Sequence, residues 1–242
     1  MSLVATVYVR EGIVMAADSR LTLNREEKHG EAAVLNLAVG QSDSNYKLFL
    51  APCGVGISTY GAADIQGVPI AGYVESFIAA ELGEELVSVG SVAEQLLKHF
   101  GAFTPVPSSQ FHVAGYSRLE TGIEQEVWHV NVASQQVART NPSGEQGASW
   151  GGEADILTRL LQPVAQVGPD GKLQQTLPQY QIPFQFFTLQ DAIDFAVFAV
   201  RSTIEAIRFQ PRAKTVGGPI DVLVIKPTIA TWIQRKELRV ER

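Results

Sequence analysis

The spacing of apolar residues changes in blocks along this chain, and the order of the blocks restricts the fold. Short β-rich runs come first, among them 3–9 and 13–17, and two stretches with helical spacing follow at about 64–82 and 91–103. Three strand-like runs, two more helical stretches and two final strands complete the order. Paired helices between sets of strands argue against the alternating order of a parallel sheet. We therefore expect an α+β fold in four layers, αββα: two antiparallel sheets face to face, covered by helix pairs.

The same reading gives the other elements and the domain organisation. Further strands are expected at 32–40, 46–49, 55–59, 111–117, 126–132, 136–140, 220–225 and 230–237, and further helices at about 153–167 and 189–209. Thr188 and Asp191 form a capping pattern before the last helix, and Pro163 is expected to kink the preceding helix or to end it early. Residues 24–30 and 166–183 read as loops. No linker or repeat divides the chain, so we expect a single domain over 1–242.

Composition and charge argue against several classes of partner. The formal net charge is −6, and the Lys and Arg residues are scattered, so no footprint for nucleic acid or an anionic membrane is expected. No uncharged run approaches the roughly 18–20 apolar residues of a membrane span. The N-terminus lacks the cationic region of a signal peptide. Cys53 is the only cysteine, which rules out an intramolecular disulfide and fits a reducing compartment; a buried, inert thiol is the simpler interpretation of it. We expect a cytoplasmic protein.

Common cofactor and metal motifs are missing from the sequence. The four histidines are His29, His99, His112 and His129, and they show neither zinc-type spacing nor clustering with cysteine. The chain has no P-loop and no G-x-S-x-G elbow. We therefore expect neither a metal ion nor a cofactor.

A hydroxyl residue, Ser2, directly follows Met1. Removal of Met1 would leave a free α-amino group beside the Ser2 hydroxyl. An amine with a reference pKa near 7.7–8.0 can accept the hydroxyl proton, so this one residue can supply both nucleophile and base. Serine at the second position is common, however, and without further context an ordinary processed terminus is the simpler explanation.

The following hairpin supplies that context. Residues 12–20, GIVMAADSR, resemble the G-V-V-L-A-A-D-S-R signature that opens β-type proteasome subunits. In that family the nucleophile is the first residue of the mature chain, sixteen positions before the signature aspartate, and Ser2 and Asp18 have this separation. The resemblance implies an N-terminal-nucleophile hydrolase with Ser2 as nucleophile and Asp18 in the site. Without the resemblance, Asp18 and Arg20 read as a structural ion pair at a strand end.

The resemblance extends to a lysine and to an oxyanion turn. Lys47 lies in NYKLF, which resembles the family's K-I-F/L strand, where the lysine charge favours loss of the nucleophile's proton. The alternative is an edge-strand lysine that blocks aggregation. Residues 55–64 resemble the turn whose backbone N–H binds the oxyanion, with Gly61 or Tyr60 as the donor.

Two supporting residues complete the implied site. The family has a G-S-G turn whose serine touches the terminal amine, and Ser149 stands in the corresponding S-W-G-G run. Ordinary turn chemistry explains Ser149 equally well. Arg20, from the signature itself, is the second supporting residue.

Taken together, the resemblance implies a bacterial proteasome-like, serine/threonine-type peptidase. The resemblance also implies a homo-oligomeric ring and a polypeptide substrate, and it leaves room for an ATPase unfoldase as a partner. Two alternatives stay open. Arg212, Ala213 and Lys214 stand where the family has an acidic residue, and added positive charge would weaken the amine as a base, which favours an inactive assembly protein. The second alternative is a small-molecule amidase of the same superfamily.

Overall fold

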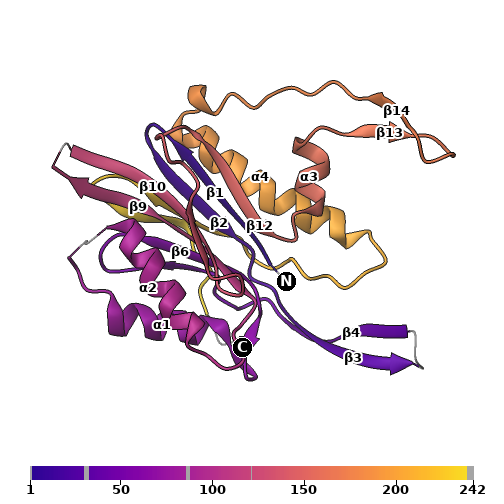
Figure 1. The fold of residues 1–242 in the computed structure, drawn as a ribbon, viewed down its shortest axis with the longest axis horizontal. Coiled ribbons are helices and arrows are strands. Elements are labelled where there is room, and N and C mark those ends of the chain that lie inside the picture. Colours follow the sequence, from indigo (N-terminus) through magenta and orange to yellow (C-terminus); the bar gives the residue numbers. More distant parts are fainter. Residues whose placement is uncertain (1, 30–32, 86–87, 121, 239–242) are drawn as a thin grey trace.

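The computed structural model describes residues 2–29, 33–85, 88–120 and 122–238. Its centre is formed by two five-stranded sheets, and every neighbouring pair of strands in them is antiparallel (Figure 1). The first sheet has the order β12 (Gly147–Gly152), β1 (Leu3–Val9), β2 (Gly12–Ala17), β15 (Asp221–Ile225) and β16 (Ala230–Gln234). The second has the order β11 (Gln136–Arg139), β10 (Gly122–Asn131), β9 (Ser109–Leu119), β6 (Gly56–Gly61) and β5 (Leu48–Leu50).

The two sheets pack against each other through one apolar layer. Side chains alternate between the faces of a strand, so Val4 and Tyr8 of β1 enter this layer while Leu3 and Val7 point to the opposite face. From the second sheet, Tyr60, Ala114 and Val127 join the same layer. Both faces of β1 are therefore buried in apolar clusters, which explains why its residues are apolar almost without interruption.

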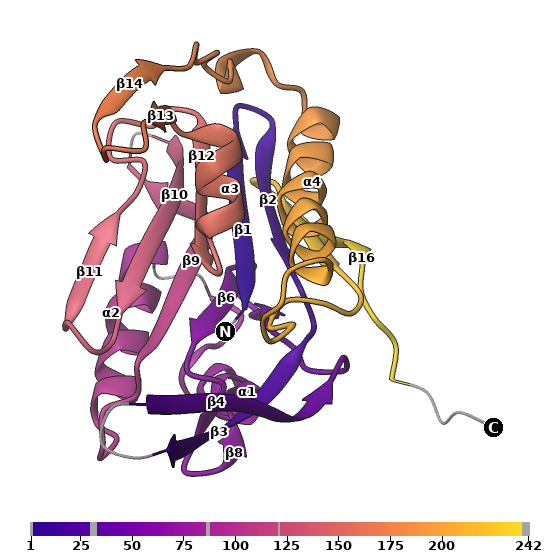
Figure 2. The ribbon, with the colours of Figure 1, turned by 90° about the vertical axis from the view of Figure 1, so that its right-hand side faces the viewer.

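Helices cover both outer faces. α1 (Ile70–Glu81) and α2 (Val89–Gly101) pack on the second sheet through a cluster that includes Phe77, Phe100 and Phe111. α3 (Asp155–Leu161) and α4 (Leu189–Arg208) pack on the first sheet, and Thr188 and Asp191 form the expected capping box of α4. Figure 2 shows α3 and α4 beside β1 and β2. The predicted α+β class and antiparallel sheets are confirmed.

The predicted loop at 24–30 was wrong over residues 24–29, while Gly30 lies outside the described residues. β3 (Leu21–His29) pairs with β4 (Ala33–Ser42) in a long hairpin that extends away from the two sheets (Figures 1 and 2). Strand preference depends strongly on what a strand packs against. A charged run therefore does not exclude pairing in a two-stranded ribbon, and the sequence pattern alone was misleading here.

The first helix starts later than its apolar spacing indicates. β7 (Asp64–Ile65) and β8 (Val68–Pro69) form a small hairpin before α1, with Gln66 and Gly67 at positive φ. The Asp64 carboxylate accepts a hydrogen bond from the Gly67 N–H at 2.9 Å, so it stabilises this turn. Pro69 then precedes the helix, where its missing N–H costs nothing.

The region between α3 and α4 also differs from expectation. α3 ends at Leu161, before Pro163, as predicted. β13 (Ala165–Val167) stands where the predicted helix and the predicted loop at 166–183 overlap, and it pairs with β14 (Leu173–Thr176) inside that loop; a short 3₁₀ turn follows at Phe184–Phe186. β12, which was not predicted, is rich in glycine and forms because it pairs with β1 along its whole length. No helix of the described residues is long and apolar enough to span a membrane.

Candidate active site

Three of the residues singled out in the sequence meet where strands of both sheets begin or end. Ser2 immediately precedes β1, Asp18 immediately follows β2, and Lys47 immediately precedes β5. All three are buried, with 8% of Ser2, 0% of Asp18 and 2% of Lys47 exposed. Because β1 and β2 are antiparallel neighbours, the start of one and the end of the other are adjacent. The chain therefore gathers a hydroxyl, a carboxylate and an ammonium at one edge of the interface between the sheets.

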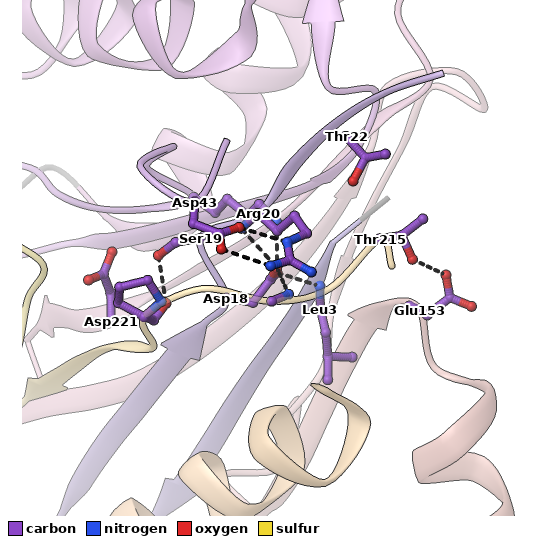
Figure 3. A network of polar contacts seen from close by, with 12 residues as sticks. Leu3, Asp18, Ser19, Arg20, Thr22, Asp43, Glu153, Thr215 and Asp221 are labelled. Atoms are coloured by element: carbon purple, nitrogen blue, oxygen red, sulfur yellow. Dashed lines mark hydrogen bonds and ion pairs between the residues drawn. The ribbon is translucent and has the colours of Figure 1, made fainter. Parts of the chain in front are cut away.

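The Asp18 carboxylate organises this cluster. Its Oδ1 accepts hydrogen bonds from the Lys47 ammonium at 2.7 Å and from the Leu3 N–H at 2.9 Å. Its Oδ2 accepts bonds from the Arg20 N–H at 3.1 Å and the Gly217 N–H at 3.0 Å. A buried charge needs this degree of satisfaction. Lys47 is thereby held beside the peptide that joins Ser2 to Leu3 (Figure 3 shows Asp18 and Leu3).

Lys47 is fixed by its backbone and by its charge. Its carbonyl accepts a hydrogen bond from the Thr59 N–H at 2.9 Å, which ties it to β6. Burial lowers the pKa of Lys47 from its ordinary value, while Asp18 acts in the opposite direction. This lysine is inside the molecule and ion-paired, so the interpretation as a solvent-facing edge lysine is wrong.

Ser2 is held by its backbone and left free at its side chain. Its carbonyl accepts a hydrogen bond from the Glu153 N–H at 2.7 Å. Gly152 permits this approach because its φ is +97° and a Cβ there would lie 1.8 Å from the Ser2 carbonyl oxygen. Among the described residues, no group bonds the Ser2 hydroxyl. The hydroxyl is therefore available for a reaction at a rigid position.

Arg20 supports the site from one side rather than pairing with Asp18. Its guanidinium makes two bonds to Asp43, Nε to Oδ1 at 2.7 Å and Nη2 to Oδ2 at 2.8 Å (Figure 3). The Arg20 hydrogen bond holds the pKa of Asp43 below its ordinary value. Gly217 lies directly against this guanidinium, since a Cβ there would be 2.5 Å from Cζ. The expected Asp18–Arg20 side-chain ion pair is replaced by two separate pairs.

Tyr60 and Gly61 lie at the end of β6, next to the Thr59–Lys47 contact. The Tyr60 ring fills the layer between the sheets and packs against Gly151, where a Cβ would lie 2.2 Å from its Cζ. Only its backbone could therefore serve an oxyanion. Gly61 has a φ of +96°, and a Cβ there would lie 2.3 Å from the Ser108 carbonyl oxygen, so a residue without a side chain is required.

Ser149 does not reach the start of β1. It lies opposite Thr6 in the β1–β12 pair, four residues along the strand from Ser2, or roughly 13 Å at the usual rise of a strand. Its hydroxyl instead bonds His112 Nε2 at 3.3 Å, and Thr6 bonds the other ring nitrogen at 3.0 Å. The role beside the terminal amine is therefore withdrawn for Ser149.

Sequence patterns did not indicate which residues neutralise Arg212. Its guanidinium bonds Glu153 at 2.6 Å and Asp155 at 3.2 Å. Glu153 also accepts a bond from the Thr215 hydroxyl at 2.9 Å (Figure 3). Lys214 donates to the carbonyls of Ile207 and Gln210 at the end of α4, where the helix dipole favours a cation. Acidic groups near Ser2 therefore come from the turn after β12 instead of from 212–214.

The described part of the chain contains no group of three or more His, Cys, Asp or Glu side chains that could hold a metal ion. No protein-family model matches this sequence, and no curated protein matches it either. The chemistry of the site therefore has to be argued from its own geometry.

Proposed function

We propose that this chain is a proteasome-like N-terminal-nucleophile peptidase in which Ser2, exposed by removal of Met1, attacks the substrate. The observation that carries the proposal is the Asp18 Oδ1 atom, which holds the Lys47 ammonium and the Leu3 N–H together while the neighbouring Ser2 hydroxyl has no partner among the described residues. The two-sheet sandwich with helices on both faces is compatible with the fold of that superfamily, to which we assign it.

Each residue of the proposed site has a separate role in the reaction. The Ser2 Oγ forms a bond to the carbonyl carbon of a peptide, and its proton passes to the α-amino group. The positive charge of Lys47 favours the ionised Ser2 oxygen and the negative charge that develops on the substrate. The backbone N–H of Gly61, or that of Tyr60, is the proposed donor to the oxyanion. The carbon–nitrogen bond then breaks, and the leaving amine takes the proton from the α-ammonium.

An ester of Ser2 remains, and water completes the cycle. The attacking water forms a bond to the ester carbon and gives a proton to the α-amino group; the bond to the Ser2 Oγ then breaks, Oγ takes that proton back, and the peptide leaves with a new carboxyl end. Asp18 accepts four hydrogen bonds, one of them from the Lys47 ammonium. Its role is to orient Lys47.

The proposed setting follows the resemblance of the opening hairpin. We propose a cytoplasmic, bacterial, ring-shaped homo-oligomer that degrades unfolded polypeptide supplied by an ATPase unfoldase. The pairing of Arg212 with Glu153 and Asp155 weakens the main argument for an inactive assembly protein, because that positive charge is compensated. A paired guanidinium has less effect on a neighbouring amine than an unpaired one, so Arg212 no longer argues that the terminal amine is a weak base.

Intact-mass measurement and peptide hydrolysis test the proposal together. We expect the purified chain to lack Met1, to cleave an unfolded protein such as casein, and to lose that activity in Ser2→Ala. Ser2→Thr is the matched control, since it retains a hydroxyl and should retain cleavage. Removal of Met1 without any cleavage by an intact ring would favour the inactive assembly protein. Hydrolysis of small amides alone would favour the amidase.

A further inference from the structure

A second buried Lys–Asp ion pair, Lys236 with Asp221, adjoins the pair of Lys47 with Asp18. Lys236, from the segment after β16, donates to the Asp221 carboxylate through its ammonium and through its backbone N–H, the latter at 2.7 Å. Only 4% of the Lys236 side chain and 1% of the Asp221 side chain are exposed. Burying an ion pair is costly unless its geometry is good, so a pair in this place calls for an explanation.

Each member of this second pair adjoins a member of the first. Asp221 lies opposite Ala17 in the β2–β15 pair, and Ala17 immediately precedes Asp18. The Lys236 ammonium lies 4.4 Å from the centre of the Tyr46 ring, and Tyr46 immediately precedes Lys47. The end of the chain thus contacts both segments that deliver Asp18 and Lys47, one through an ion pair and one through a cation–π contact.

We propose that Lys236 is a positioning residue of the Ser2 site. Lys236 holds the segments that carry Asp18 and Lys47 in place, and its buried positive charge repels the Lys47 ammonium. The inference rests on the proposed function for its catalytic meaning only; the coupling between the two lysines does not depend on that function.

The charges around Lys47 give this coupling its sign. Asp18 from the end of β2 and Asp43 from the segment before β5 favour the protonated lysine, while Lys236 disfavours it. The lowered pKa of Lys47 comes first from burial, and Lys236 adds to that effect. Asp221 forms its ion pair with Lys236, and Arg20 forms its ion pair with Asp43. Removing the Lys236 charge should therefore raise the pKa of Lys47.

The test measures the pKa of Lys47 directly, by NMR titration of the protein with ¹³C-labelled lysine side chains, the Lys47 signal being assigned by its loss in Lys47→Arg. In Lys236→Met we expect the midpoint of Lys47 to move to higher pH. The double variant Lys236→Met/Asp221→Asn, which leaves no unpaired carboxylate, should move it in the same direction. Arg235→Gln is the matched control: it removes an exposed cation that lies over Tyr46 and Trp232, and the midpoint should stay in place.

A midpoint of Lys47 that is unchanged in both Lys236 variants, with the native circular dichroism spectrum retained, would overturn the inference. This readout needs no activity, so it is independent of whether Ser2 is a nucleophile. Where Ser2 reacts, the pH profile of its acylation should shift to higher pH in Lys236→Met and stay unchanged in Arg235→Gln. A lower rate at every pH with an unshifted profile would show a merely structural role for Lys236.

Discussion

Two polar clusters lie between the sheets, and they differ in what they leave unbonded. At one edge, Asp18 and Lys47 form a buried ion pair beside Ser2, whose hydroxyl has no partner among the described residues. Farther along the same interface, His112 is bonded on both ring nitrogens, by Thr6 and by Ser149. The first cluster contains charges and a free hydroxyl. The second contains hydroxyls and an imidazole that satisfy one another.

The difference shows that burying polar groups does not by itself make a reactive site. A serine next to a histidine is a familiar nucleophile–base pair, yet Ser149 and His112 lie within the sandwich, and burial lowers the pKa of His112 to about 3. Such a ring stays neutral and keeps its hydrogen bonds. Ser2 is buried as well, with 8% exposed, but its hydroxyl has no partner among the described residues and it lies beside the Lys47–Asp18 pair. We expect reactivity at the first cluster and stability from the second.

The largest expected effect is loss of the Lys47 charge. Lys47→Met leaves the Asp18 carboxylate buried without its cation, which typically costs about 3–5 kcal/mol in the free energy of unfolding. It should also abolish acylation of Ser2. Urea denaturation and labelling by an acylating probe measure the two effects. Lys47→Arg, which retains a cation, is the control and should recover part of the stability; equal stability of wild type and Lys47→Met would contradict the buried pair.

The His112 cluster should make stability depend on pH. An unfolded histidine has a pKa near 6.5, and the folded value is about 3. Between these values the unfolded chain binds the additional proton, so the contribution is complete above pH 6.5 and is lost as the pH falls toward 3. The expected slope is about 1.4 kcal/mol per pH unit.

Urea denaturation from pH 7 to pH 4.5 measures that slope, and His112→Gln removes the titrating group. The difference in free energy of unfolding between wild type and variant should shrink as the pH falls. A difference independent of pH would show that His112 is not neutral and buried in the way described. Acylation of Ser2 measured at one pH should be the same in both proteins.

The smallest expected effect is that of Ser149→Ala. It removes one hydrogen bond to His112, and a single hydrogen bond contributes about 0.5–1.5 kcal/mol. Thermal unfolding should show this small loss, and the rate of Ser2 acylation should not change. A large loss of acylation with little loss of stability would instead place Ser149 in the reaction, as the family resemblance implied.

Local sequence patterns predicted the parts of the molecule that local spacing controls. The opening hairpin, the capping box at Thr188 and the relation of Ser2 to Asp18 all depend on residues close in sequence. The periodicity of strands and helices was sufficient for the antiparallel sheets. β12 was not predicted, since a glycine-rich run becomes a strand only through pairing with β1.

The surroundings of the site could not be predicted for the same reason. Asp43, Glu153 and Lys236 are brought to the site by the pairing of distant segments, and none stands in a pattern that indicates a partner. Arg212 illustrates the consequence. Taken from the sequence alone, its charge argues against catalysis, whereas Glu153 and Asp155 compensate that charge in the fold.

The central claim is that Ser2 is the nucleophile, and acylation by a β-lactone tests it most directly. Attack of the Ser2 hydroxyl on the lactone carbonyl opens the ring and leaves an ester, so the chain gains the full mass of the probe. We predict one adduct per chain, located on Ser2 by peptide fragmentation, present in Ser149→Ala and absent from Ser2→Ala. An unmodified Ser2 in a folded chain from which Met1 has been removed, or an adduct that persists in Ser2→Ala, would contradict the claim.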